Sequence, residues 1–258
     1  MRLARVLVLL AALACLPSLA RAYVYGPYGV NIRWDQCFGD GGPQNKNFAC
    51  DTNTGSGTLV GSFVPAWDIV NVDELEIVID IAFSGSNVPP WWLRGNSALC
   101  RGTPLTVTTT DSPAAFACPS WSGEAQVAGG IGAYDIGARG PNTIRMIVLV
   151  AVPPGSEQAL TGRDEYFGFN IVINHARTVG TNSCAGCTTP ACMVFEGLRM
   201  VTTDPVSDRY LTGPSNLTDS NYATWQGGGV PVVGGQAGCP AATPTLQRTW
   251  GAVKALYH

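Results

Sequence analysis

Apolar and polar residues alternate along several stretches of the chain with a period of two. Such a period is typical of strands that bury one side and expose the other. The clearest stretch is residues 73–83, in which one side consists of Leu75, Ile77, Ile79, Ile81 and Phe83 and the other includes Glu74, Glu76 and Asp80. Residues 165–179 repeat the pattern, with Phe167, Phe169, Ile171 and Ile173 on one side. Both stretches predict half-buried strands.

Four further stretches predict strands of other kinds. Residues 143–152 are apolar on both sides apart from Arg145, which predicts a strand inside its sheet. Residues 29–34, 58–64 and 192–203 complete at least six candidate strands. Gly197 predicts a β-bulge in the last of them, because the alternation changes phase around Glu196.

Helical periodicity appears only in the last residues, where Trp250, Val253 and Leu256 have helical spacing across a short segment that contains Gly251. Many strands, frequent Gly and Pro between them and no β-α-β alternation predict an all-β fold. We expect an antiparallel β-sandwich of jelly-roll type, formed by residues 23–258 as one domain. Its C-terminal tail is expected from about residue 214, tethered by a disulfide.

The N-terminus has the features of a secretory signal peptide. Arg2 and Arg5 precede an apolar run from Val6 to Leu16, and Ala20 and Ala22 provide a small-residue cleavage site. We therefore expect residues 1–22 to be removed, which leaves no transmembrane segment and a secreted protein at the cell surface, in the periplasm or outside the cell. Lipid attachment at Cys15 is a weaker alternative.

The charge of the predicted mature chain argues against nucleic-acid partners. Cleavage removes Arg2, Arg5 and Arg21, so that 12 of the 15 basic residues remain against 18 acidic ones. Phosphate binding needs clustered Lys and Arg, and the sequence contains no such cluster. The same lack of clustered basic residues argues against binding to anionic membrane surfaces.

Eight of the nine cysteines remain after signal cleavage, and an even number in an exported chain predicts four disulfides. Proximity in the sequence favours Cys37 with Cys50 and Cys100 with Cys118. The dense segment "CAGCTTPAC" contains Cys184, Cys187 and Cys192, and we expect two disulfides to lock it, one of them to Cys239.

Two other interpretations of the dense cysteine segment are less favoured. Zinc could bind its three thiolates with Cys239 or His175 as the fourth ligand, but export to an oxidising compartment favours disulfides. A redox-active C-x-x-C normally opens a helix in a β-α-β unit, whereas this one lies between two predicted strands. We therefore predict neither a metal nor a cofactor.

Catalytic motifs are scarce. The chain has two histidines, and His258 is its last residue, so a triad would have to use His175. The sequence contains no G-x-S-x-G, H-E-x-x-H, P-loop or dinucleotide motif. Strand carboxylates could still catalyse glycoside hydrolysis, and the candidates for this alternative are Glu76, Asp80, Glu165 and Glu196.

Three loop tryptophans are the predicted ligand-binding residues. Trp91 and Trp92 follow two prolines, and Trp121 lies just after Cys118. Rigid, exposed indole rings can stack on sugars, so these residues predict a contact patch for carbohydrate or another cell-surface protein. The alternative is that they are buried in the core, as large aromatics usually are.

Residues 31–65, the "CAGCTTPAC" loop and the C-terminal "CPAATPTLQRTWGAVKALYH" resemble a group of uncharacterised secreted bacterial proteins. The resemblance implies bacterial export but supplies no activity. Our leading hypothesis is a non-catalytic extracellular protein in structure, adhesion or ligand binding. A secreted carbohydrate-active hydrolase and a self-assembling cell-surface subunit are the alternatives.

Overall fold

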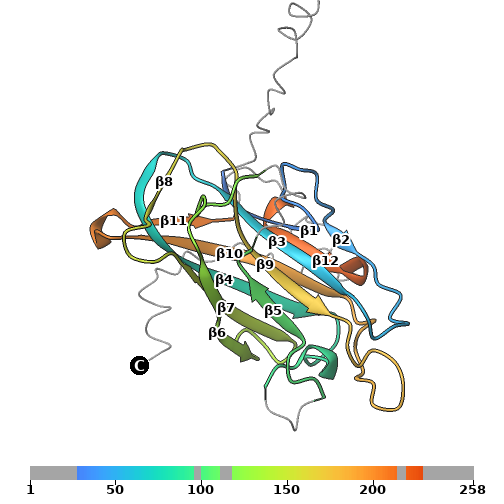
Figure 1. Cartoon of the computed structure of the whole chain (residues 1–258). Helices are drawn as coiled ribbons and strands as arrows, with labels where there is room; N and C mark the ends of the chain where they lie inside the picture. Colours follow the sequence, from blue (N-terminus) through green and yellow to red (C-terminus); the bar gives the residue numbers. More distant parts are fainter. Residues whose placement is uncertain (1–27, 96–99, 111–117, 214–218, 229–258) are drawn as a thin grey trace, which may run out of the picture.

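A computed structural model describes residues 28–95, 100–110, 118–213 and 219–228 of the chain. Twelve strands in this part form two sheets that pack face to face, and its helical residues are confined to short 3-10 turns (Figure 1). The predicted all-β, antiparallel sandwich is therefore confirmed. The predicted signal peptide lies outside the described residues.

The smaller sheet has four antiparallel strands in the order β1-β3-β9-β5. These strands are β1 (Gly29–Trp34), β3 (Ser56–Val64), β9 (Tyr166–Asn174) and β5 (Leu105–Thr108). β9 is the strand expected from the alternation in residues 165–179. Its alternate residues Phe169, Ile171 and Ile173 face the other sheet and belong to the core.

The larger sheet has eight strands. Its main path is β2-β12-β10-β4-β7-β6, while β8 pairs with β4 and β11 pairs with β10. The pairing is antiparallel except between β12 and β2. The bounds of these strands are β2 (Asn45–Lys46), β12 (Tyr222–Trp225), β10 (Ala191–Thr202), β4 (Ile69–Phe83), β7 (Thr143–Ala151), β6 (Ala128–Ile136), β8 (Gln158–Leu160) and β11 (Arg209–Thr212).

Short 3-10 turns lie beside several strands, namely η1 (Pro90–Trp92), η2 (Pro205–Ser207), η3 (Asp219–Asn221) and η4 (Gln226–Gly228). The last two flank β12, which lies between β10 and β2 in the sheet. Residues 219–228 therefore belong to the sandwich, although we expected the tail to begin at about residue 214.

The period-two pattern decides which side of each central strand is buried. In β4, the side chains of Leu75, Ile77, Ile79, Ile81 and Phe83 are all at most 1% exposed and pack into the core. β7 lies between β4 and β6, as expected for a strand inside its sheet. The predicted bulge is present in β10, where the register against β4 shifts between Phe195 and Gly197 and Glu196 is the extra residue.

Four tryptophans interlock at one end of the core. The rings of Trp34, Trp91 and Trp92 each have their centroid within 5.8 Å of the centroid of Trp225. The Trp225 indole donates to the carbonyl of Cys187, and the Trp34 indole donates to the carbonyl of Thr224. Aromatic pairs at such distances contribute about 0.5–1.5 kcal/mol each beyond the burial of their surface. We call these four residues the tryptophan cluster.

Three disulfides are described, and they join other partners than proximity in the sequence suggested. Cys50–Cys187 and Cys100–Cys184 lie at the end of the tryptophan cluster, whereas Cys37–Cys118 packs against Val60 and Phe167. The bridges are Cys37–Cys118, Cys50–Cys187 and Cys100–Cys184, with sequence separations of 81, 137 and 84 residues. The predicted pairs Cys37–Cys50 and Cys100–Cys118 are therefore wrong. Each cysteine pairs with one that the sheet pairing brings near, and not with its neighbour along the chain.

The "CAGCTTPAC" loop takes part in more than the two disulfides we expected, because Cys184 and Cys187 are each bonded to a distant cysteine, Cys100 and Cys50. Cys192 is disulfide-bonded as well. Its predicted partner, Cys239, lies outside the described residues. All seven described cysteines are thus oxidised, so the zinc and redox interpretations of this segment lack free thiols.

Replacement of Cys50 and Cys187 by alanine should lower the free energy of unfolding by about 4–5 kcal/mol. The reason is the long loop that this bridge closes, because loop entropy of the unfolded chain grows with loop length. Urea unfolding of the double variant and the parent chain measures the difference. A loss below about 1 kcal/mol would contradict the role given to this bridge.

Candidate functional site

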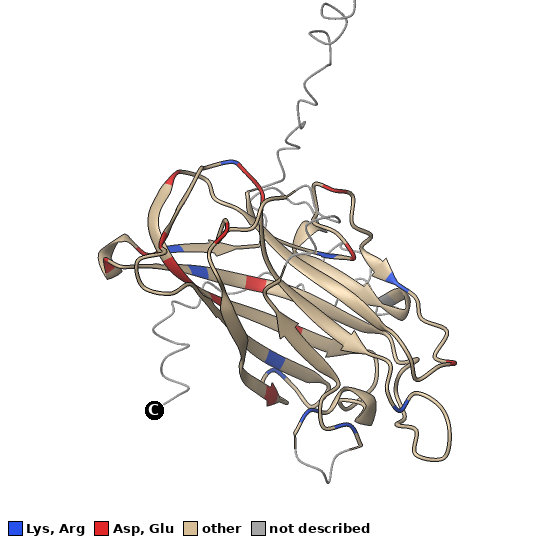
Figure 2. Ribbon diagram, in the orientation of Figure 1, with Lys and Arg blue, Asp and Glu red and all other residues tan. Residues whose placement is uncertain are grey.

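The outer face of the larger sheet, which points away from the core, brings together three of the four predicted carboxylates. On β4, Glu76 and Asp80 point outward, and they lie opposite Arg199 and Val194 of β10. Glu196 is the extra residue of the bulge in β10, next to Asp80. Strand pairing thus brings acidic and basic residues of β4, β7 and β10 next to one another, and Figure 2 marks such residues along the neighbouring strands.

Asp80 is the centre of a buried charge cluster with Arg139, Arg145 and Glu196, which we call the Asp80 cluster. Its side chain is 2% exposed. Arg145 donates to both carboxylate oxygens through Nε and Nη2, at 2.8 Å each. Arg139, from the turn between β6 and β7, places its Nε 2.6 Å from Asp80 Oδ2. Such bidentate, charge-assisted pairs are about twice as strong as neutral hydrogen bonds.

Glu196 completes the Asp80 cluster as the second carboxyl group. Its Oε1 lies 3.9 Å from Arg139 Nη2 and has no hydrogen-bond partner. Burial and then the charge of Asp80 raise the pKa of Glu196 to about 8. Glu196 is therefore protonated at neutral pH, so the two neighbouring carboxyl groups carry a single negative charge between them.

Glu76 belongs to a second cluster along the same face. Arg199 donates through Nη1 to Glu76 at 2.9 Å and through Nε to Asp208 at 3.0 Å. Asp208 also accepts a hydrogen bond from the backbone N–H of Thr202. This cluster ties β4, β10 and the turn before β11 together across the sheet.

These arrangements do not resemble the carboxylate pair of a glycoside hydrolase. Such enzymes hold two carboxyl groups about 5–9.5 Å apart across the scissile bond, with room for the sugar between them. Asp80 is instead enclosed by two arginines, and Glu196 lies directly beside it. Glu76 is held by Arg199. The contacts of these three carboxyl groups are those of groups that hold strands together.

The fourth predicted carboxylate, Glu165, lies apart from the others, just before β9 of the smaller sheet. It accepts hydrogen bonds from the hydroxyl of Ser62 and from the backbone N–H groups of Phe38 and Gly39, the latter two at 3.1 and 2.7 Å. Burial raises its pKa, while these hydrogen bonds oppose the rise. Glu165 thus anchors the loop after β1 to the smaller sheet.

His175 does not join any of these carboxylates. Its ring stacks on Phe48 with centroids 3.7 Å apart, and Nδ1 lies 3.1 Å from the carbonyl oxygen of Thr54. Burial lowers the pKa of His175, so the ring is neutral at pH 7. These contacts place His175 at the rim of the tryptophan cluster.

The three predicted ligand-binding tryptophans are core residues. Trp91 and Trp92 are fully buried, and Trp121 is 2% exposed. Trp91 stacks on Trp225 and lies under the guanidinium of Arg101, whose Cζ is 3.9 Å from the ring centroid. The rings therefore offer no accessible face to a sugar, and the predicted patch is wrong. Trp91 and Trp92 lie at the end closed by Cys50–Cys187 and Cys100–Cys184, whereas Trp121 lies beside the start of β9, where its backbone N–H donates to the carbonyl of Phe167.

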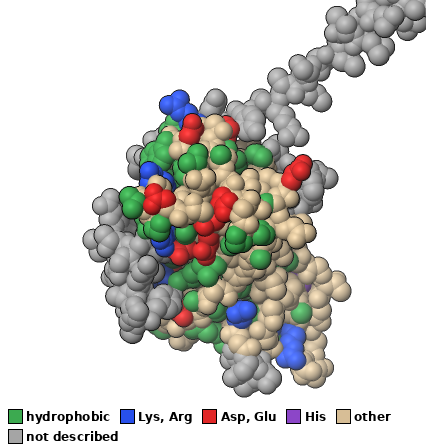
Figure 3. Space-filling view, turned by 60° about the vertical axis from the view of Figure 1, so that its left-hand side comes forward, with side chains coloured by type: hydrophobic (Ala, Val, Ile, Leu, Met, Phe, Trp, Pro, Cys, Tyr) green, Lys and Arg blue, Asp and Glu red, His purple; other side chains and the backbone are tan. Residues whose placement is uncertain are grey.

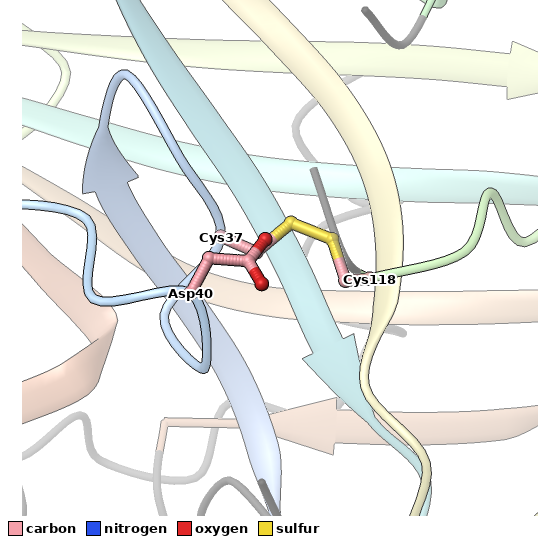
Figure 4. A group of neighbouring side chains, drawn as sticks. All are labelled: Cys37, Asp40 and Cys118. Carbon is pink, nitrogen blue, oxygen red and sulfur yellow. A yellow bond between two sulfur atoms is a disulfide. The ribbon is translucent and has the colours of Figure 1, made fainter. Parts of the chain in front are cut away.

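One group of side chains has the spacing of a metal site. Cys37, Asp40 and Cys118 offer ligand atoms within 4.8 Å of one another (Figure 4). The two sulfur atoms are joined in the Cys37–Cys118 disulfide, however, and zinc binds cysteine as the thiolate. The group therefore has only the Asp40 carboxylate as an anionic ligand while the bridge is intact.

The end of the sandwich opposite the tryptophan cluster exposes apolar side chains. Of the seven large, exposed apolar residues in the described part of the chain, four lie there, namely Trp67, Val70, Val206 and Tyr210. We call these four the end patch. Trp67 is 49% exposed and Tyr210 is 45% exposed. Figure 3 shows apolar side chains interleaved with acidic ones at the end that includes β8 and β11.

One backbone hydrogen bond links the neighbourhoods of Val70 and Val206 in the end patch. The carbonyl of Asn71, next to Val70, accepts from the N–H of Thr203, three residues before Val206. Tyr210 lies opposite Arg199 in the pair of β11 with β10. The sequence analysis did not single out Trp67. Pro65 and Asp68 beside it mark a turn between two strand patterns, and a large aromatic in such a turn is more exposed to solvent than one in a disulfide-linked loop.

No family model, curated protein or solved structure matches this chain. None of the helices in the described parts of the chain has the length and apolar character that a membrane crossing requires.

Glu196→Gln should change how stability depends on pH. The folded-state pKa of Glu196 lies above its unfolded value. Its stabilising contribution to the free energy of unfolding is therefore present below about pH 4.5 and is lost as the pH rises to about 8. The free energy of unfolding of the variant, relative to the parent, should therefore increase over this window. Urea unfolding at several pH values measures the difference, with exposed Glu124→Gln as the control; a constant difference for Glu196→Gln would contradict the raised pKa.

Asp80→Asn should destabilise the fold by about 3 kcal/mol, because it leaves the two arginines without their shared counter-charge. Arg145 is the more buried of the two, with 13% of its side chain exposed. Thermal and urea unfolding of the variant test the expectation. A change below about 1 kcal/mol would show that the Asp80 cluster does not stabilise the sheet.

Proposed function

We propose that this chain is an exported, non-catalytic β-sandwich protein that acts in extracellular structure, adhesion or ligand binding, and that it contacts its partner through the end patch. The observation that carries the proposal is the exposure of Trp67 and Tyr210 together at one end. Exposed apolar side chains gathered at one end, with polar neighbours, are a common feature of interaction sites.

Export is supported by the oxidation of the cysteines. All seven in the described part of the chain are disulfide-bonded, and stable disulfides are typical of secreted, periplasmic and cell-surface proteins. The predicted signal peptide, residues 1–22, agrees with this compartment. The resemblance to secreted bacterial proteins is a further, weaker reason to place the chain outside a bacterial cell.

A non-catalytic role is supported by the contacts of the acidic residues. Asp80, Glu76 and Glu165 each accept hydrogen bonds that join separate elements of the fold. Groups used in this way are poorly placed to exchange protons with a substrate. The end patch instead offers one indole and one phenol ring to a partner, a combination suited to stacking on sugar rings.

Binding to insoluble polysaccharides tests the proposal. The exported protein is incubated with cellulose, chitin and peptidoglycan, and the fraction that sediments is measured. We expect binding to at least one of them, and we expect Trp67→Ala with Tyr210→Ala to reduce it at least tenfold while leaving the melting temperature within a few degrees. The matched control is Val179→Ala, an exposed apolar residue at the opposite end.

Two outcomes would count against the proposal. Binding that survives the double replacement would place the contact elsewhere. Release of soluble sugar, abolished by Glu76→Gln or Glu196→Gln, would replace the non-catalytic role by the hydrolase alternative.

A further inference from the structure

A second apolar area lies on the outer face of the larger sheet, and it is buried. Cys192 and Val194 on β10 and Tyr222 on β12 form a cluster in which each residue is at most 3% exposed. They point away from the core, because the intervening Met193 and Ala223 belong to it. Val194 and Tyr222 are opposite each other in the strand pair. We call these three residues the outer cluster.

The described elements do not account for this burial. Those in contact with β10 and β12 are their sheet neighbours, β1 on the core side, and the 3-10 turns next to them in the sequence. An outer apolar face is normally buried only when another segment packs on it. These strands leave the outer side of the cluster uncovered, so a further segment packs there.

Cys192 indicates which segment provides the cover. The other six described cysteines pair with one another, yet Cys192 is disulfide-bonded too. The remaining cysteines of the sequence are Cys15 and Cys239. Since Cys15 belongs to the predicted signal peptide, Cys239 is the partner that an exported chain retains.

We infer that residues 229–258 of this chain lie across the outer cluster and are held there by a Cys192–Cys239 disulfide. The segment begins directly after η4, which follows β12. Thr224 of β12 lies opposite Cys192, so the segment starts beside its attachment point. About a dozen residues lead to Cys239, and an extended chain of that length spans roughly 35 Å or more, which is ample.

The composition of the segment fits this surface. Trp250, Val253 and Leu256 provide apolar side chains for the outer cluster. The apolar side chains of the chain's own terminus thus match the apolar surface of the outer cluster. The outer cluster would then be closed to other partners.

Mapping the disulfides of the exported full chain tests the covalent link. Proteolysis without reduction, followed by mass spectrometry, should yield a peptide pair joined by Cys192 and Cys239, from protein that runs as a monomer on a non-reducing gel. A Cys192 joined to Cys15, or to Cys239 of a second chain in a covalent dimer, would overturn the inference.

Hydroxyl-radical footprinting of the same protein tests the cover itself. Tyr222 should be modified at least tenfold more slowly than Tyr210, the exposed control on the same sheet. Trp250→Ala with Leu256→Ala should raise the rate at Tyr222 severalfold and leave the rate at Tyr210 unchanged. An unchanged rate at Tyr222 in this variant, with the disulfide intact, would show that another segment covers the face.

Discussion

The packing of the tryptophan cluster under two disulfides is the constraint on which the rest of the structure depends. Trp225 contacts three other indoles, and it does so from β12, the last described strand. The bridges Cys50–Cys187 and Cys100–Cys184 pull together loops that are far apart in the sequence above these rings. A low-charge chain of this kind gains from covalent links because they reduce the entropy of the unfolded state.

The charged residues follow from the same architecture. Once the inner faces of β4, β7 and β10 are apolar, their polar residues must share the outer face. Asp80, Arg145 and Glu196 meet there because the bulge in β10 turns an extra side chain outward. The outcome is a set of paired charges on the outer face. The end patch and the outer cluster are the apolar surfaces to which we assign contacts with a partner molecule and with the chain's own terminus.

The strands and their buried sides could be predicted from the sequence, because they follow from the local alternation of apolar and polar residues. Alternation in residues 73–83 identified β4 and its buried side, and Gly197 identified the bulge. Disulfide pairing could not be predicted in this way, since Cys37 meets Cys118 only through the order of strands in the smaller sheet. The burial of Trp91 and Trp92 could not be predicted either, because local sequence shows only that they lie in a loop. Their burial depends on bridges between distant parts of the chain.

Hydrogen–deuterium exchange on the oxidised protein tests the central claim, that the disulfide-closed end is the stable centre and the end patch a free surface. The account predicts the slowest exchange in the strand amides around the tryptophan cluster, in β10, β12 and the adjoining part of β4. It also predicts exchange faster by at least tenfold in residues 65–70 and 203–208. Equal protection at the two ends, or slower exchange at the end patch, would contradict it.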